Sequence, residues 1–338
     1  MKTIRAGVIG VGYLGRFHAQ KYSAMPNVDL VGVADIETDR ASAVAAECGC
    51  RPYADFRRLI REVDAVSVVV PTMHHHAVAM ACLEAGIDVL VEKPITTTLA
   101  EADELISLAA AKDLVLQVGH LERFNPAVLA MQPLLTQPLF IEAHRISVFK
   151  NRGTDVDVVL DLMIHDIDII LSIVKAEIRT IHTVGAPVIT PLTDIANARL
   201  IFENGCTANV TVSRISMDNI RRMRIFQPGQ YLSVDFSKRE VMAVTAAPES
   251  SARELIPRID RHRFPDQDIL EMELADFITN VRNRTRPMVS GREGRQALEV
   301  ALEVVSQIRE NQARMQHILG KGQSLAGIRI DQPLDDSD

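Results

Sequence analysis

The stretch IRAGVIGVGYLG, residues 4–15, decides the fold. Its first half is an apolar run rich in β-branched residues, which predicts a buried strand, and its second half has the pattern G-x-G-x-x-G. Gly10 permits a tight turn, Gly12 lets the backbone approach a pyrophosphate, and Gly15 allows close packing of the next helix against the strand. Tyr13 and Leu14 begin that helix, whose N-terminus attracts negative charge. The stretch therefore predicts the first strand, turn and helix of a dinucleotide-binding fold.

Asp35 follows the second predicted strand, close to the position at which an acidic side chain binds the ribose hydroxyls of a bound adenosine. A carboxylate there repels the 2′-phosphate of NADP, so the sequence favours NAD as the cofactor. Arg40 lies slightly further along the chain and keeps NADP as the alternative. A glycine-rich turn that binds no dinucleotide is the other interpretation of the motif.

Strand-like and helix-like runs alternate up to residue 120, which is the pattern of a parallel sheet with crossover helices. The predicted strands are residues 4–9, 28–34, 65–70, 88–91 and 115–119, and the predicted helices are residues 13–25, 38–48, 75–85 and 98–112. With right-handed crossovers these elements form a doubly wound α/β domain with five parallel strands, the Rossmann fold.

The pattern changes after residue 125 to mixed helices and consecutive strands. Helices are predicted at residues 156–174, 266–282 and 292–314, and strands at residues 139–148, 197–202, 206–215, 221–226 and 231–236. Turn dipeptides between the strands predict an open, mainly antiparallel sheet, covered partly by the last two helices and partly by an oligomer partner. We therefore expect an NAD-binding domain at residues 1–120, an α+β substrate-binding and oligomerisation domain at residues 121–330, and an acidic tail at residues 331–338.

Composition excludes several classes of protein. The 338 residues are 47% hydrophobic and 24% charged, with a net charge of −7, which is typical of a folded protein with no general attraction to nucleic acid or anionic lipid. No apolar run reaches the roughly 18 residues of a membrane span, and the N-terminus does not resemble a signal peptide, so we expect no membrane insertion and a cytoplasmic location. The four cysteines lack the spacing of a zinc site and are expected to be free thiols.

The tripeptide Glu92-Lys93-Pro94 follows the fourth predicted strand, at the carboxyl edge of the sheet where open α/β folds bind their ligands. A lysine ammonium at this edge can bond to a substrate hydroxyl, favour loss of its proton and align the carbon against a nicotinamide. An exposed loop lysine without such a role is the alternative.

The segment PTMHHH, residues 71–76, follows the third predicted strand at the same edge. Three consecutive histidines on a helix point about 100° apart and have no carboxylate or thiolate beside them, so we expect no metal site. We expect Thr72 and His75 to line the nicotinamide side of the cleft, and His74 and His76 to be solvated. The cofactor contacts expected at this edge are Pro71, Thr72, His75, Glu92 and Lys93.

The segment DVVLDLMIHDID, residues 157–168, carries a polar stripe on an otherwise apolar helix. Spacings of four, four and three place Asp157, Asp161, His165 and Asp168 on one helical face. His165 has a side chain whose ordinary pKa suits proton transfer near neutral pH, and Asp161 one turn earlier can orient it. We interpret the pair as a general base with its orienting carboxylate, and an ordinary amphipathic helix facing solvent is the alternative.

The segment GHLERFNP, residues 119–126, lies where the chain passes between the two predicted domains. Clefts between domains are common sites for small molecules, so we expect His120, Arg123 and Asn125 to contact substrate. The alternative is a hinge held by local hydrogen bonds.

Together these motifs resemble, in order and spacing, the glucose–fructose oxidoreductase, inositol dehydrogenase and MocA (Gfo/Idh/MocA) family of sugar oxidoreductases. The resemblance implies a Rossmann domain, an open-sheet domain used to form a homodimer or homotetramer, and oxidation of a sugar ring hydroxyl by NAD(P). It makes Lys93 the lysine of the family's Glu-Lys-Pro element, and it makes Asp161 and His165 the D-x-x-x-H pair of the inositol dehydrogenase branch.

The forms GHLERFNP and DLMIHDID are most similar to bacterial enzymes that oxidise the 3-hydroxyl of UDP-N-acetylglucosamine on the way to lipid A. Binding of a UDP sugar requires donors for its diphosphate, and the candidates are Arg221, Arg222, Arg224 and the arginines within residues 253–263. Oxidation of free inositol or a free hexose, and a dinucleotide-binding sensor without catalysis, are the alternatives.

Overall fold

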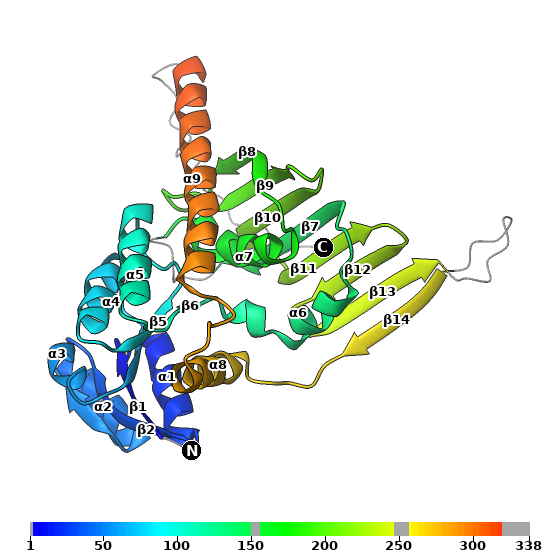
Figure 1. Cartoon of the computed structure of the whole chain (residues 1–338). Helices are drawn as coiled ribbons and strands as arrows, with labels where there is room; N and C mark the ends of the chain where they lie inside the picture. The colour runs from blue at the N-terminus through cyan, green and yellow to red at the C-terminus, as the bar shows by residue number, and fades with distance from the viewer. Residues whose placement is uncertain (1–2, 150–155, 247–256, 320–338) are drawn as a thin grey trace, which may run out of the picture.

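The computed structural model describes residues 3–149, 156–246 and 257–319 of the chain. Its strands form two separate sheets, one of six strands and one of eight (Figure 1). The six-stranded sheet is built from the first part of the chain and the eight-stranded sheet from residues after 139, which agrees with the predicted α/β class.

The first sheet is parallel, with the strand order β3-β2-β1-β4-β5-β6 of a doubly wound dinucleotide-binding fold. Its strands are β1 (Ile4–Ile9), β2 (Val28–Ala34), β3 (Arg51–Tyr53), β4 (Ala65–Val68), β5 (Asp88–Glu92) and β6 (Leu116–Gly119). The prediction of five strands was wrong, because it missed β3. This edge strand has only three residues, two of them exposed and one a proline, so it carries none of the usual strand pattern.

Helices connect these strands on both faces of the sheet. They are α1 (Tyr13–Ala24), α2 (Thr38–Cys48), α3 (Phe56–Leu59), η1 (Thr72–His74), α4 (His75–Glu84) and α5 (Leu99–Ala111). Thr98 and Glu101 form a reciprocal cap at the start of α5, and Gly49 ends α2 in the left-handed conformation at φ 68°. The local sequence thus fixes the start of α5 and the end of α2.

The second sheet has the strand order β14-β13-β12-β11-β7-β10-β9-β8. Its strands are β7 (Phe140–Val148), β8 (Ile178–Ala186), β9 (Ile195–Phe202), β10 (Thr207–Ser216), β11 (Ile220–Gln227), β12 (Gln230–Asp235), β13 (Glu240–Ala246) and β14 (Pro257–Arg263). All neighbouring strands are antiparallel except β7 and β10, which run parallel. The sheet is therefore mainly antiparallel, as predicted.

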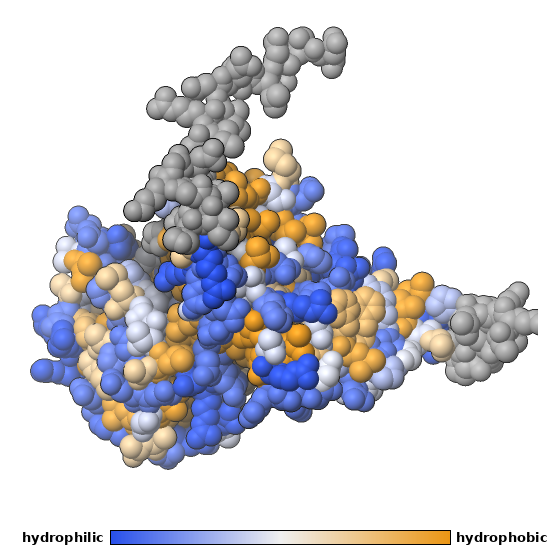
Figure 2. All heavy atoms as spheres, turned by 90° about the horizontal axis from the view of Figure 1, so that it is seen from above, coloured by the Kyte–Doolittle hydropathy of each residue, from blue (hydrophilic) through white to orange (hydrophobic). Residues whose placement is uncertain are grey.

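One face of the second sheet is covered by helices that follow or precede its strands (Figure 1). These are α6 (Pro126–Met131), η3 (Gln132–Leu134), the π-helical turn η4 (Val159–Met163), α7 (Ile164–Ile173) and part of α9 (Gly291–Leu319). The short helix η2 (Leu121–Phe124) precedes α6, and its Phe124 belongs to a core of the first sheet. On the opposite face, the partly buried rings of Phe140, Phe226 and Tyr231 stack with centroids 5.7 and 4.9 Å apart. Figure 2, the view from above, shows hydrophobic and hydrophilic surface side by side.

Helix α8 (Ile269–Asn283) packs on the first sheet, although its sequence follows the second. Its buried residues Leu274 and Phe277 belong to the same core as Ile4 and Val8 of β1. The prediction that α8 helps to cover the second sheet was therefore wrong. An amphipathic pattern shows that a helix has a buried face but not which sheet receives it. No helix in the described part of the chain is long and apolar enough to cross a membrane.

Candidate active site

The glycine-rich loop between β1 and α1 has the shape that its sequence demands. Gly10 has φ +85°, and a Cβ added to it would lie 2.7 Å from the Val69 carbonyl oxygen. A Cβ on Gly15 would lie 1.9 Å from the carbonyl oxygen of Gly10, so no larger residue fits there. A Cβ on Gly12 would meet no atom within 4 Å. Gly10 and Gly15 are thus required by the protein's own backbone, whereas Gly12 faces open space.

This open space lies at the N-terminus of α1, where Gly12 is the cap residue and provides no side-chain acceptor. The first amide groups of a helix that lacks such a cap are available to an anion, and the helix dipole favours negative charge there. Tyr13 is 71% exposed beside the loop and packs edge-on against Phe17, while Leu14 is half-buried. The loop therefore fits the pyrophosphate of a dinucleotide.

Asp35 joins the end of β2 to the glycine-rich loop. Its Oδ2 accepts a hydrogen bond from the Val11 amide at 2.9 Å, and its Oδ1 accepts one from the Glu37 amide at 2.9 Å. The Arg40 guanidinium lies 3.3 Å from the same carboxylate. The carboxylate thus lies beside the glycine-rich loop and holds Arg40, and its contact with a ribose stays a prediction.

Lys93 reaches from the first sheet to the helix that carries the predicted base. Its Nζ donates hydrogen bonds to the backbone oxygen of Asp161 at 2.7 Å and to the Asp161 carboxylate at 3.3 Å. The side chain of Lys93 is 17% exposed and that of Asp161 is 41% exposed. The ammonium therefore lies at the junction of the two sheets, held by a carboxylate but still open to a small molecule.

His165 is buried on α7 and packs edge-on against the buried ring of His120, with ring centroids 6.1 Å apart. Burial, followed by the positive charge of Lys93, lowers the pKa of His165 well below its ordinary value. The same two causes lower the pKa of His120 to about 3. Both rings are consequently neutral at pH 7, and a neutral imidazole is the form that accepts a proton.

The interpretation of Asp161 as the carboxylate that orients His165 was wrong, because its hydrogen bonds are with Lys93. The predicted single stripe was also wrong. Asp157 caps the start of the helix by accepting from the Val159 amide, and Asp168 bonds to Arg123 in the interior. The π-helical turn η4 lies between Asp157 and His165, so the 100° periodicity on which the stripe was based does not hold through this segment.

Arg123 and Asn125 hold the passage between the two sheets. Arg123 donates to Asp168 at 3.3 Å, and Asn125 caps α6 through the Ala127 amide and donates to the Phe236 carbonyl at 3.2 Å. Both side chains are buried. This arrangement favours the hinge interpretation, and a role for either residue in substrate binding stays a prediction.

His75 and Glu92 point into the protein rather than into the cofactor cleft. The ring nitrogens of His75 lie 2.8 Å from the carbonyl oxygens of Pro94 and Val70, so this histidine ties η1 to the loop that carries Lys93. The Glu92 carboxylate lies 3.2 Å from Nε2 of the buried His18 on α1. Pro71 is exposed at this edge and Thr72 is half-buried, and their contact with a cofactor stays a prediction.

The prediction missed a buried cluster of charges beneath His165. Arg145 on β7 donates to both carboxylate oxygens of Asp166 at 2.9 Å and to Glu122 at 3.1 Å. The alternation of β7 contained the signal, because Arg145 continues the inward positions of Ile141 and Ala143. A charged residue at an inward position predicts a buried partner of opposite charge.

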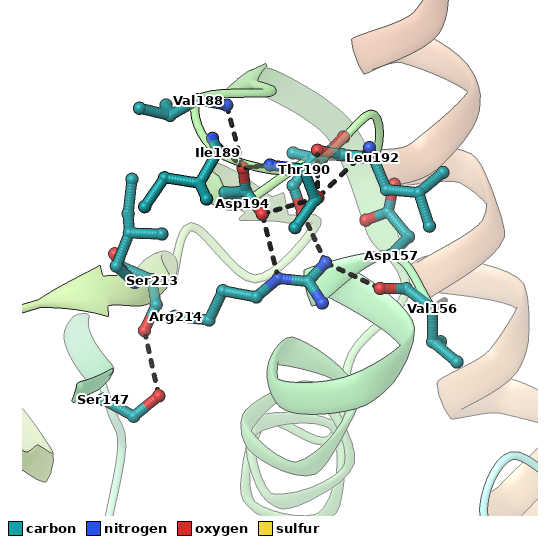
Figure 3. A network of polar contacts seen from close by, with 12 residues as sticks. Ser147, Val156, Asp157, Val188, Ile189, Thr190, Leu192, Asp194, Ser213 and Arg214 are labelled. Carbon is teal, nitrogen blue, oxygen red and sulfur yellow. Dashed lines mark hydrogen bonds and ion pairs between the residues drawn. The ribbon is translucent and has the colours of Figure 1, made fainter. Parts of the chain in front are cut away.

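A second network fixes the start of the helix that carries Asp161 (Figure 3). Arg214 on β10 donates to the carbonyl oxygens of Val156 at 2.6 Å and Thr193 at 2.9 Å, and its Nε lies 3.3 Å from the carboxylate of Asp194. Asp194 is fully buried and accepts three backbone N–H groups from the turn after β8. The network joins this turn, β10 and the residues just before η4.

Within the described ranges no group of three or more histidine, cysteine, aspartate or glutamate side chains could hold a metal ion. His74 is exposed, and His76 pairs with Glu104 at 2.8 Å. Cys48, Cys50, Cys82 and Cys206 are free thiols.

Comparison with known proteins gives matches over both parts of the chain. Residues 4–120 match the GFO_IDH_MocA oxidoreductase family, described as an NAD-binding Rossmann fold, and residues 140–227 match the GFO/IDH/MocA C-terminal domain. UDP-N-acetylglucosamine 3-dehydrogenase of Acidithiobacillus ferrooxidans is 40% identical over 305 residues, which cover 90% of this chain and 97% of that protein. A solved structure of that enzyme superposes with a TM-score of 0.86 over 92% of this chain and 99% of that one, at 39% identity.

More distant relatives have other substrates in their names. Myo-inositol 2-dehydrogenase of Thermotoga maritima is 25% identical over 94% of this chain and the whole of that protein. Levoglucosan dehydrogenase in complex with NADH superposes with a TM-score of 0.82 over 91% of this chain and 98% of that one. Its 18% identity shows a shared fold.

Proposed function

This chain belongs to the Gfo/Idh/MocA oxidoreductase family, and we propose that it oxidises the 3-hydroxyl of UDP-N-acetylglucosamine to a ketone with NAD as the hydride acceptor. The observation that carries the proposal is the bridge from Lys93 to Asp161 beside the neutral His165. The choice of substrate is supported by the 40% identity to an enzyme named for it over nearly the whole of both chains.

The chemistry needs a proton acceptor and a donor to the alcohol oxygen. We assign the acceptor to His165, whose buried ring is neutral at pH 7 and can take the hydroxyl proton. We assign the donor to Lys93, whose ammonium can bind the alcohol oxygen and stabilise the negative charge that develops on it. Asp161 holds the ammonium in place. When bound, the nicotinamide supplies the acceptor for the hydride that leaves the ring carbon.

Several residues of the chain would hold the dinucleotide. The N-terminus of α1, which has no side-chain cap, suits its pyrophosphate, and the carboxylate of Asp35 suits the ribose hydroxyls. NAD is preferred in this proposal because Asp35 would repel a 2′-phosphate and because Arg40 is already paired with Asp35.

The test is NADH formation, followed by its absorbance, with UDP-N-acetylglucosamine, its uronic acid, free N-acetylglucosamine and myo-inositol, each with NAD and with NADP. The proposal expects turnover only with UDP-N-acetylglucosamine and NAD. Lys93→Met should then lower kcat by roughly 10²–10⁴-fold while the variant still binds NADH, as measured by its fluorescence. Turnover confined to myo-inositol would refute the substrate, and NADH binding without any turnover would indicate a sensor.

We further propose that the protein forms a homodimer or homotetramer through the open face of the second sheet. The stacked rings of Phe140, Phe226 and Tyr231 on that face support this assembly. Phe226→Glu should give a monomer in sedimentation velocity, and an unchanged sedimentation coefficient would refute the interface. The resemblance to enzymes of lipid A precursor synthesis supports a cytoplasmic role in the same process.

A further inference from the structure

Strand β11 carries three arginines, and its pleat divides them between two faces of the second sheet. Arg221 pairs in register with Arg145 of β7, which points toward the helix-covered face with the buried side chains of that sheet. Arg222 and Arg224 alternate with it and point to the opposite, open face. There Arg222 pairs with Asp235 and Arg224 with Glu142. Only Arg221 of these three therefore lies on the side of the sheet that carries His165.

Arg221 and Arg145 form a cross-strand pair of like charges, an arrangement that destabilises a sheet unless the charge is compensated. The carboxylate of Glu122 lies between them, 3.1 Å from Arg145 and 3.5 Å from Arg221. Arg145 is buried and is also bound by both oxygens of Asp166. Arg221 has the longer contact, and its side chain is 48% exposed. Its remaining N–H groups are thus accessible while Glu122 fixes its position.

Arg221 lies close to the proposed catalytic base. Its cross-strand partner Arg145 binds Asp166, which directly follows His165 in the sequence. The charge of Arg221 also contributes to lowering the pKa of His165, after burial and after the charges of Lys93, Arg145 and His120. An anion bound to Arg221 would therefore lie beside a substrate whose hydroxyl faces His165.

We infer that Arg221 binds the diphosphate of a nucleotide-sugar substrate and thereby selects UDP sugars over free sugars. The inference rests on the proposed function. A guanidinium presents a planar fork of donors that matches phosphate oxygens, and such charge-assisted hydrogen bonds are among the strongest in proteins. The diphosphate and the 3-hydroxyl are attached to the same sugar ring. When the hydroxyl faces His165, the diphosphate is therefore within reach of a cation near His165.

The experiment compares Arg221→Gln with Arg222→Gln, a matched control from the same strand whose side chain faces the other way. The probe is UDP alone, measured as a competitive inhibitor of UDP-N-acetylglucosamine oxidation and by calorimetric titration of the enzyme. Arg221→Gln should weaken UDP binding and raise the KM for UDP-N-acetylglucosamine by about 10–100-fold, the usual effect of losing hydrogen bonds to a charged group. It should change kcat by less than about threefold and leave NADH affinity unchanged, since a uniform binding contact affects KM alone. Arg222→Gln should match the wild type.

Other outcomes separate the failure of this inference from the failure of the proposed function. Wild-type enzyme that oxidises a UDP sugar, together with an Arg221→Gln variant of unchanged UDP affinity, would refute the role of Arg221 alone. Loss of kcat at unchanged UDP affinity would show that Arg221 positions the base, and it would also refute the inference that Arg221 binds the diphosphate. Wild-type enzyme that binds no UDP would refute both proposals. If Arg221→Gln does not fold, Arg221→Met keeps the aliphatic stem without the charge, and UDP affinity equal to wild type in that variant would overturn the inference.

Discussion

Replacing Asp194 by asparagine removes one charge from the network in Figure 3 without changing the size of the side chain. The carboxylate is fully buried and lies 3.3 Å from Arg214, whose side chain is 8% exposed. Removing one partner of a buried pair costs roughly 3–5 kcal/mol. The asparagine oxygen can still accept the backbone N–H groups that Asp194 binds, so we expect the lower end, a loss of about 3 kcal/mol in the free energy of unfolding at pH 7.

The loss should depend on pH in a direction that the structure fixes. Burial raises the pKa of Asp194, but hydrogen bonds from the backbone amides of Thr190, Val188 and Ile189 outweigh it, and the pKa lies below its ordinary value. A carboxyl with a lowered pKa in the folded state stabilises the protein above its unfolded pKa, and this stabilisation is lost as the pH falls through the folded pKa. The difference between wild type and variant should therefore be full at pH 7 and shrink below about pH 4.

Urea unfolding followed by circular dichroism measures this difference at each pH. The matched control is Asp260→Asn, which removes the charge of an exposed pair with Arg258 and should cost less than about 1 kcal/mol. Because Arg214 also holds the Val156 carbonyl just before η4, Asp194→Asn should lower kcat while NADH affinity stays unchanged. Equal unfolding midpoints for wild type and Asp194→Asn at pH 7 would refute the reasoning.

Three further predictions concern the cofactor loop, the ribose position and the base. Gly12→Val should keep the melting temperature of the wild type but lose NADH affinity in fluorescence titration, because its side chain enters space that the protein leaves open. Gly15→Val should instead fail to fold stably, because its Cβ would collide with the backbone. Equal effects of the two substitutions on melting temperature and NADH affinity would contradict this. Asp35→Ser should raise kcat/KM for NADP relative to NAD, because it removes the repelling carboxylate and releases Arg40, and an unchanged ratio would count against the assignment. Because burial and the charge of Lys93 lower the pKa of His165, log kcat/KM should stay level from pH 8 to pH 6.5 and fall only in more acidic solution; a fall centred on the ordinary histidine pKa would exclude His165 as the base.

The first sheet followed from the sequence because its strands, glycine-rich turn and helices all have local patterns that agree with one another. Strand β3 escaped prediction because three residues in register with β2 owe their conformation to pairing rather than to their own pattern. The sequence did not predict which sheet α8 packs on, for a similar reason. Its apolar face was evident, but the contact with Ile4 and Val8 depends on the path of the chain through the second sheet.

The roles proposed for the candidate site residues stay predictions, but the structure shows which other residues these side chains contact. Lys93 and His165 were identified from position and residue type, and the structure brings both to the junction of the sheets. The residues that contact Lys93 and His165 come from other segments of the chain, so the spacing of residues along one helix could not predict them. Asp161 lies in the π-helical turn η4 and contacts Lys93 from the first sheet, and His120 packs beside His165 from another segment.

The return of α8 to the first sheet has a consequence for how this protein can be divided or recombined. A fragment that ends at residue 120 would leave the apolar surface around Ile4 and Val8 without Leu274 and Phe277, and it would expose that surface to water. The cofactor-binding half is thus made from two distant pieces of the gene. An exchange of substrate domains between relatives would therefore have to replace an internal segment that ends before α8. Replacing everything after a single junction would remove α8 from the first sheet and prevent stable folding.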